Sequence, residues 1–463
     1  MSGLFTNCSQ RIQILFNEKI VSKYKYMINT FGFNTLIVLF CVYWSQGFKS
    51  LCSLAITFYY KDLFHLEPAE TQYIRTFSFI AWFIKPIYGL ISDNIPIAGY
   101  YRKSYLFIWG VIGILSMLSI LLHNNLYLSI IAFVINEFSQ AFCDVIADAI
   151  MVEKSRNDEA GSSALQTFSW TVLAIGGFLG SIFGGLLLET FSPRTIIALS
   201  AICPFLIIVS AYHLEENSNE RKDFYTQVQT LLEIFKKPQI IKPLLFILVL
   251  SGVTPRFSEL FTYYMTDVLK FSTTFMGSLQ VAAYISVIIG SWVYHIFLKN
   301  LEYRSIIGIG QIVMMLINFF DLGLVTELYK RLSLPAWTFV LFGDILGGVV
   351  SFTFKSMPLL VMNAKICPVG IEGTFYALFT SVTNLSYSIS GFFGGFLVKA
   401  FDIKTGNYEL FWLLVCIQIF SQLIPLVFLK LLPKIGMEQQ EEVVDVELLD
   451  DDLENDEEKT HKL

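Results

Sequence analysis

Charged residues are scarce in this chain. Only 15% of its 463 residues are Asp, Glu, Lys or Arg, whereas 54% are hydrophobic and 16% are aromatic. An average soluble domain carries about 25% charged residues, so this composition excludes an ordinary soluble protein and indicates a polytopic membrane protein. Much of the acidity lies in one run near the C-terminus, EQQEEVVDVELLDDDLENDEEK, so the net charge of −6 does not describe the rest of the chain.

Sequence motifs for catalysis are also missing. The seven cysteines show no paired spacing and no C-x-x-C element, so we expect buried hydrophobic side chains and no disulfide framework. The chain has no Walker loop, no G-x-G-x-x-G after a strand and no His/Cys set with metal-ligand spacing. We therefore expect no enzyme activity, no cofactor, no metal and no nucleic-acid partner. A carrier without a nucleotide site would use an ion gradient.

About twelve apolar segments are long enough to span a bilayer. They lie near 34–59, 70–92, 103–122, 126–149, 164–188, 194–213, 242–265, 273–298, 305–325, 334–358, 371–400 and 408–431. The longest polar interruption before the tail separates the sixth segment from the seventh, which is the repeat layout of major facilitator transporters. We predict an all-α membrane protein with twelve transmembrane helices in two six-helix bundles, the major facilitator fold.

The same segments set the predicted domain boundaries. They are a cytosolic N-terminal segment at 1–30, an N-terminal bundle at 31–213, a cytosolic linker at 214–240, a C-terminal bundle at 241–433 and an acidic disordered tail at 434–463. Lys and Arg concentrate in the loops of one side, so both termini are predicted to be cytosolic. We expect a monomer in the lipid bilayer. The plasma membrane is favoured over an internal membrane as its location. Residues 445–449 fit an acidic dileucine pattern, which indicates a sorting signal or merely a solvating tail.

A polar hinge joins the second and third apolar segments, in AWFIKPIYGLISDNIPIAGYYRKSYLFIWG. We expect its glycine to allow close helix approach, its aspartate to cap a helix N-terminus, and its bases to pair with carboxylates of the opposing bundle. Such a charge cluster would latch one conformation of a transporter. The alternative is a turn with ordinary positive-inside charges. The glycine, aspartate and basic positions that are typical of the major facilitator superfamily are filled here by Gly89, Asp93, Gly99, Arg102 and Lys103.

This hinge departs from the general superfamily pattern, because NIPIA separates the aspartate from the second glycine. KPIYGLISDNIPIAGYYRKSYL closely resembles the corresponding segment of the folate–biopterin transporter family. Two further stretches, CDVIADAIMVEKSRND and ICPVGIEGTFYALFTSVTNLS, resemble that family's aspartate-rich fourth helix and the segment that leads into its eleventh helix. The resemblance implies a symporter that moves folate, pterin or a related small organic anion by alternating access, with protons as the coupling ion.

Two alternatives stay open from the sequence. The first keeps the fold and changes the cargo to an amino acid, a nucleoside or a sulfur-containing solute. The second is a transport-inactive receptor or scaffold that acts through the acidic tail. Uptake into proteoliposomes separates them, because a scaffold would take up no solute, and a carrier of another solute would ignore competing folates and pterins.

Ionisable side chains inside the apolar segments need partners or water, because each costs a few kcal/mol at bilayer depth. Glu137, Asp144 and Asp148 lie at i, i+7 and i+11, so three carboxylates share one face of the fourth helix. Asp344 and Lys355 are also eleven apart and should share a face of the tenth helix. So many charges predict a polar cavity.

The cationic candidates for substrate binding lie in the first, seventh and tenth helices. Arg256 follows Pro255, where we expect a break in the seventh helix that exposes backbone groups inside the bundle. We assign Arg256 and Lys355, with Lys49 as a further base, to the anionic end of the substrate. Glu137 or Asp144 would hold the ring, since a carboxylate accepts an N–H and an amino group together. Bases and acids are expected at separate places.

Asp144, together with Glu137, is also the candidate proton carrier, because desolvation and like-charge repulsion favour its protonated form. The alternative is that Lys85 neutralises Asp144 permanently and the pair serves as a strut. Lys85 could instead snorkel to the membrane surface. Near the cytosolic end of the fourth helix, Asp148 and Glu153 are expected to pair with the hinge bases, so that Glu153 belongs to the latch.

Overall fold

The computed structural model describes residues 25–155, 159–216, 236–366 and 372–433, together with Tyr225 and Gln229. The predicted N-terminal segment and linker lie partly outside these residues, and the acidic tail lies wholly outside them. Secondary structure in the described ranges is helical, with two isolated β-bridges in loops, Ile97 to Tyr100 and Lys404 to Asn407. This confirms the prediction of an all-α protein.

Eight helices in the described ranges are long and apolar enough to cross a membrane. They are Phe33–Leu63, Pro68–Asn94, Leu126–Lys154, Ala164–Leu187, Pro193–His213, Thr273–Leu298, Tyr303–Val325 and Ala336–Asn363. Three further apolar helices are shorter, namely Lys103–Ser119, Pro238–Gly252 and Phe411–Val427, and α20 (Glu372–Ala400) has 29 residues. Together these helices account for the twelve predicted segments, so the chain is an integral, multi-pass membrane protein.

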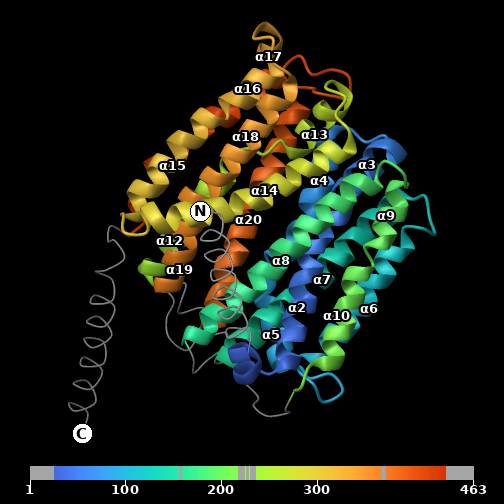
Figure 1. Ribbon diagram of the computed structural model, residues 1–463, viewed down its shortest axis with the longest axis vertical. Helices are drawn as coiled ribbons and strands as arrows, with labels where there is room; N and C mark the ends of the chain where they lie inside the picture. The colour runs from blue at the N-terminus through green and yellow to red at the C-terminus, as the bar shows by residue number, and fades with distance from the viewer. Residues whose placement is uncertain are drawn as a thin grey trace, which may run out of the picture. The chain divides into compact units, whose positions relative to one another are not determined.

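The chain divides into two compact units. The first contains Met1–Tyr59 and Ile84–Gln227. In it α2 packs against α8 and α10, while α6 packs against α7 and α10, as Figure 1 shows. Its principal helices are α2 (Phe33–Phe48), α5 (Lys85–Asn94), α6 (Lys103–Ser119), α7 (Leu126–Ser155), α8 (Glu159–Leu187) and α10 (Ile202–His213).

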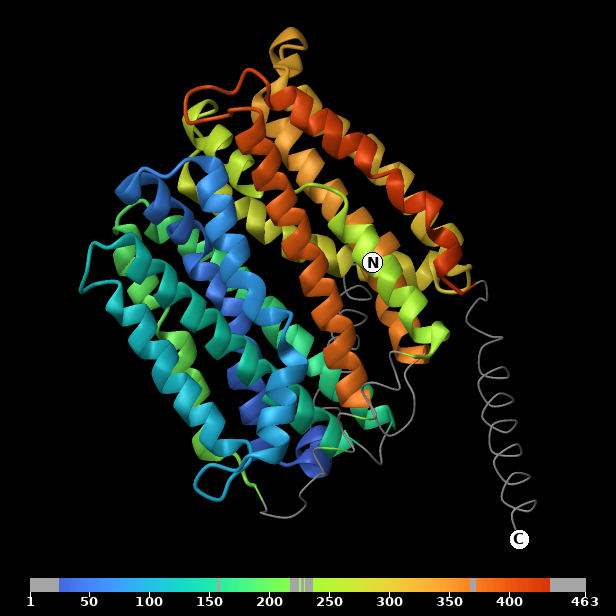
Figure 2. The ribbon, with the colours of Figure 1, turned by 180° about the vertical axis from the view of Figure 1, so that it is seen from behind.

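The second unit contains Tyr60–Phe83 and Val228–Leu463, and therefore includes the first part of the second span. In it α20 packs against α12 and α4, and α14 packs against α18 (Figure 2). The division into bundles at 31–213 and 241–433 stays a prediction. The helices used below are α4 (Pro68–Ser78), α12 (Pro238–Gly252), α13 (Ser258–Asp267), α14 (Thr273–Val293), α16 (Phe319–Val325), α18 (Ala336–Ser351) and α21 (Phe411–Ser421).

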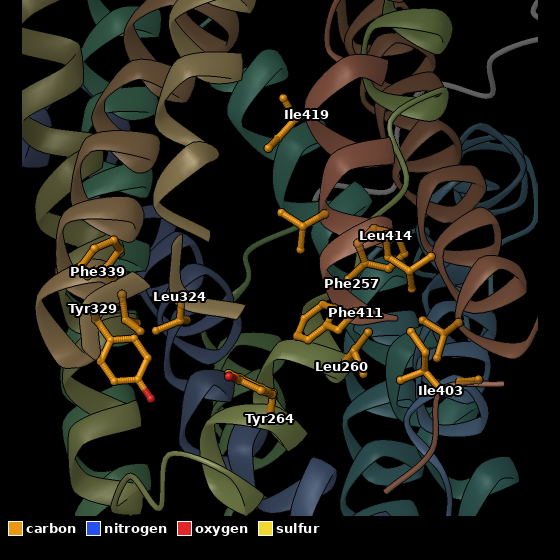
Figure 3. Close-up of a cluster of buried hydrophobic side chains, with 14 of the residues drawn as sticks. Phe257, Leu260, Tyr264, Leu324, Tyr329, Phe339, Ile403, Phe411, Leu414 and Ile419 are labelled. Carbon is orange, nitrogen blue, oxygen red and sulfur yellow. The ribbon is translucent and has the colours of Figure 1, made fainter. Parts of the chain in front are cut away.

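An aromatic and aliphatic cluster fixes α13 against α21 in the second unit (Figure 3). Phe411 is 1% exposed and meets Phe261 edge-on, with 4.9 Å between the ring centroids. Tyr264 contacts the same ring at 5.5 Å. Aromatic pairs of this geometry add to the stabilisation from burial alone. The cluster therefore anchors α13, the helix that begins just after the Arg256 segment.

Irregular turns occur where the sequence places charges in apolar segments. Lys49 begins a 3-10 turn, Lys49–Cys52, and Lys355 lies in a π-helical turn, Phe352–Ser356. The seventh segment is interrupted between α12 and α13, as predicted from Pro255, because proline cannot donate a helical hydrogen bond. Such turns free backbone groups and are frequent at functional sites.

Candidate functional site

Three side chains of the first span meet the three carboxylates of α7, and we call these pairs the carboxylate ladder. Its rungs are Tyr43 Oη donating to Asp148 Oδ1 at 2.5 Å, Gln46 Nε2 donating to Asp144 Oδ1 at 2.5 Å, and Lys49 Nζ donating to both Glu137 oxygens at 2.8 Å. The common carboxylate face predicted for the fourth helix is therefore present. It faces the first span.

A second lysine reaches the ladder from α5. Lys85 Nζ donates to Asp144 Oδ2, so both oxygens of this carboxylate have a donor, Lys85 on one and Gln46 on the other. The Lys85 and Asp144 side chains are 5% and 6% exposed. Lys85 is thus buried and ion-paired and does not snorkel. This geometry is the one expected if the pair is a strut.

The Lys49–Glu137 rung is the more accessible ion pair of the ladder. Its side chains are 29% and 16% exposed. Bases and acids were expected at separate places, but Lys49 and Glu137, two of the predicted substrate-binding residues, bind each other. The separation could not be judged from sequence, because it depends on which faces of two helices meet.

The other two predicted bases lie together in the second unit. The Arg256 guanidinium lies 4.7 Å and the Lys355 ammonium 5.8 Å from the centroid of the Tyr387 ring, on α20. We call Arg256, Lys355 and Tyr387 the cation cluster. Arg256 is exposed and Lys355 is half-buried. Within the described part of the chain, neither cation forms an ion pair with a carboxylate.

A close backbone approach holds Arg256 against α20. The Arg256 N–H donates to the Ser390 carbonyl at 3.1 Å. A Cβ at Gly394 would lie 1.8 Å from the Arg256 carbonyl oxygen, so only glycine fits there. The helix break after Pro255 and this glycine therefore fix the backbone of Arg256.

The common face of Asp344 and Lys355 stays a prediction, and within the described residues the two side chains form no ion pair. Lys355 lies within the π-helical turn Phe352–Ser356, which departs from the regular α-helix on which the eleven-residue spacing was based. On the neighbouring helix α16, Asp321 Oδ1 would lie 3.5 Å from a Cβ at Gly343, the residue before Asp344.

The hinge charges form contacts inside the first unit. Arg102 Nη2 donates to Glu153 Oε1 at 2.5 Å and to Asp93 Oδ1 at 3.3 Å. The pairing of Arg102 with Glu153 agrees with the expectation for that carboxylate. Pairing with carboxylates of the opposing bundle was expected for the hinge bases, but the partners of Arg102 are both local. Asp148 was expected to pair with a hinge base, and it binds Tyr43 instead.

A carboxylate that the sequence analysis overlooked caps the helix after the hinge. Glu216 accepts hydrogen bonds from the backbone N–H groups of Tyr101, Arg102 and Lys103 at 2.7, 3.1 and 3.0 Å. An acceptor at a helix N-terminus satisfies donors that have no intrahelical partner. The Lys103 ammonium itself lies 5.7 Å from the Tyr100 ring centroid.

The two hinge glycines differ. Gly99 has φ +84°, which a residue with a side chain rarely adopts, so this turn requires glycine. A Cβ at Gly89 would lie 3.7 Å from Val145 Cγ1, an ordinary contact distance. The close helix approach expected at Gly89 is therefore wrong for this structure.

Sequence reasoning missed Tyr43, Gln46 and Tyr387. The first two lie three residues apart and three before Lys49, and this spacing alone places them on one helix face. Polar side chains at this spacing on an apolar helix are therefore the sequence signal that points to Tyr43 and Gln46. Tyr387 is one of 22 tyrosines, and nothing in its surroundings in the sequence distinguishes it.

With this geometry in place, comparison with known proteins decides the family. The sequence profile of the BT1 family matches residues 46–448. The chain belongs to the BT1 family.

Curated relatives of this BT1 protein cover most of its length. A folate-biopterin transporter of Synechocystis sp. is 32% identical over 86% of this chain and 81% of its own. Probable folate-biopterin transporter 4 of Arabidopsis thaliana is 29% identical over 89% and 97%, and folate transporter 1 of Plasmodium falciparum is 29% identical over 84% and 77%. The family resemblance noted in the sequence is thus confirmed.

Solved structures confirm the major facilitator fold of the BT1 protein. A D-xylose–proton symporter superposes with a TM-score of 0.64 at 13% identity, covering 88% of this chain and 100% of that chain. A nucleoside transporter superposes with a TM-score of 0.66 at 15% identity, covering 86% and 99%. At 13% and 15% identity, the structural similarity shows the fold alone.

Proposed function

We propose that this BT1 protein is a secondary transporter that moves folates, pterins or a related small organic anion by alternating access. The names of the curated relatives supply the substrate class, because they are folate and folate–biopterin transporters. The major facilitator fold supplies the transport mechanism.

The cation cluster carries the proposal. Two cations share one aromatic ring, at 4.7 and 5.8 Å, and among the described residues no carboxylate pairs with either. Like charges at bilayer depth repel each other and are costly without an anion. An anionic ligand would relieve both costs. The carboxylates at the glutamate end of a folate have the required charge, and guanidinium groups bind carboxylates with directed hydrogen bonds.

Tyr387 gives this site a second property. Its ring faces both cations and already takes part in cation–π contacts. A flat aromatic part of the ligand, such as the benzoyl group of a folate, can stack on a tyrosine ring. The assignment of Glu137 or Asp144 to the pteridine ring stays a prediction, as does that of Lys49 to the anionic end.

The membrane arrangement follows from the loop charges. We propose that both termini are cytosolic, since the hinge bases Arg102 and Lys103 and the neighbouring Lys154 lie on the side that the positive-inside rule assigns to the cytosol. We further propose a monomer in the plasma membrane. The contacts of Arg102 with Asp93 and Glu153 serve as the conformational latch.

Substrate comparison tests the cation cluster. Removing the charge in Arg256→Gln should raise the KM for folate by about ten- to a hundredfold, because a hydrogen bond to a charged group is worth about 1.5–3 kcal/mol. The KM for a pterin without the glutamate tail should change by less than about threefold, since it lacks the anion. Radiolabelled uptake into proteoliposomes measures both constants.

Arg331→Gln is the matched control, because Arg331 is exposed, ends the short helix Leu328–Arg331 and is not part of the cation cluster. It should change neither KM. Equal losses for folate and the tail-less pterin in Arg256→Gln would contradict the assignment of this residue to the anionic end.

A further inference from the structure

The carboxylate ladder has one more acid than bases. Glu137 has Lys49 on both oxygens, and Asp144 has Lys85 on one oxygen and Gln46 on the other. In the described part of the chain, the hydrogen-bond donor of Asp148 is the neutral Tyr43 hydroxyl at 2.5 Å. Three carboxylates therefore face two lysines.

We propose that Asp148 is the residue that binds the transported proton. The inference rests on the proposed function, since it assigns the coupling step of that transporter. A half-buried carboxylate at bilayer depth that has no base as its hydrogen-bond donor is costly, and protonation removes that cost. The surplus of a single negative charge in the ladder corresponds to one bound proton.

The chemistry of the partners separates Asp148 from Asp144. A protonated carboxyl group must donate its O–H, so it needs a partner that can accept. The Tyr43 hydroxyl both donates and accepts, and can bind Asp148 in either protonation state. The Lys85 ammonium has three donors and no acceptor, so protonation of Asp144 would place donor against donor. The Tyr43–Asp148 rung can thus persist while the proton comes and goes.

The charged groups around Asp148 fit a coupling role. Tyr43 reaches it from α2, Asp144 lies one turn away on α7, and Lys85 on α5 is within electrostatic range. From α8, which also packs against α7, residues 164–187 contribute no ionisable side chain. A proton on Asp148 removes a negative charge next to the Lys85–Asp144 pair, so it changes the electrostatic energy of that ion pair directly. Asp148 is half-buried, whereas Asp144 is buried.

The proton balance is simple. On one side of the membrane the Asp148 carboxylate takes up one proton and becomes a neutral carboxyl group. After the conformational change that group loses the proton to the other side and becomes a carboxylate again. No other bond forms or breaks, so the step needs no co-reactant.

Asp148→Asn is the decisive variant, because asparagine keeps an acceptor for Tyr43 and cannot carry the proton. In proteoliposomes a pH gradient should drive folate or pterin accumulation by the wild type and should have no effect on Asp148→Asn. Exchange of labelled for unlabelled substrate at equal pH should be retained within about threefold, since exchange requires no net proton movement. Gradient-driven accumulation by Asp148→Asn would overturn the proposal.

Asp144→Asn is the matched comparison. It leaves Lys85 without its anion, so accumulation and exchange should fall together. If the wild type transports folate without any response to the pH gradient, the proton inference is wrong and the proposed function stands.

A measurement that needs no substrate tests the protonation of Asp148 even if none of the tested solutes is transported. Infrared difference spectra of the purified protein between alkaline and acid pH should show a carboxylic-acid carbonyl band that disappears in Asp148→Asn. The same band should stay in Glu153→Gln, which removes the partly exposed carboxylate nearer the hinge. A band that survives in Asp148→Asn would overturn the inference whether or not the substrate is correct.

Discussion

The Lys85–Asp144 pair allows a quantitative test of the ladder. Both side chains are about 5% exposed, so water does little to screen either charge once its partner is gone. Breaking a buried ion pair by removing one partner costs about 3–5 kcal/mol, because the other charge stays buried. We therefore expect Lys85→Met and Asp144→Asn each to lower the free energy of unfolding by about that amount.

The double variant should behave differently. With Lys85→Met and Asp144→Asn together, no charge is stranded, and the new asparagine side chain can still accept from Gln46. Its free energy of unfolding should return to within about 1 kcal/mol of wild type, since neutral replacements of buried pairs are often tolerated. The two single losses add to about 6 kcal/mol or more, so the coupling energy of this double-mutant cycle is about 5 kcal/mol or more.

Denaturant titration in detergent micelles, followed by tryptophan fluorescence, measures the cycle. The exposed pair Lys330–Glu327 serves as the control, with side chains 58% and 45% exposed. It should show no measurable coupling, because surface pairs are screened by water and salt. Additive losses at Lys85 and Asp144 would refute the strut and the ladder geometry with it.

Two further predictions concern backbone and latch. Gly394→Ala should lower the free energy of unfolding by about 1–3 kcal/mol and weaken folate uptake, because its Cβ would lie 1.8 Å from the Arg256 carbonyl oxygen. Gly89→Ala is the control, because its Cβ would lie 3.7 Å from Val145 Cγ1, an ordinary contact distance. Equal losses for the two variants in a denaturant titration would contradict the close approach of α20 to Arg256. Arg102→Glu should slow uptake about tenfold through repulsion from Asp93 and Glu153, and adding Glu153→Arg should restore part of the rate. Failure of that rescue would argue against the latch.

The sequence predicted the helices well because their cause is local. Apolar runs of about 20 residues must form helices in a bilayer, whatever their neighbours are. The break at Pro255 was predicted from the N–H that proline lacks, but Pro243 lies inside α12 without ending it, so a proline alone does not determine where a helix breaks. Family membership was also accessible, because the hinge, the aspartate-rich helix and the segment before the eleventh helix carry it.

The pairing of side chains could not be predicted, because it depends on contacts between helices. To predict the carboxylate ladder, one must know the register in which the first span packs against α7. To predict the Lys85–Asp144 contact, one must also know the position of α5. Sequence spacing also does not show local changes of helix geometry, such as the π-helical turn Phe352–Ser356 that contains Lys355. The cation cluster combines both difficulties. Arg256 lies at a helix break, Lys355 lies in a π-helical turn, and Tyr387 lies on the regular helix α20.

Uptake by the purified protein tests the central claim most directly. Wild-type protein in proteoliposomes should take up labelled folate, and unlabelled folates and pterins should compete while nucleosides and amino acids should not. Empty liposomes give the background. Saturable folate uptake with this competition pattern is the predicted result. No uptake of any solute, or uptake of another solute that folates and pterins leave unchanged, would contradict the account.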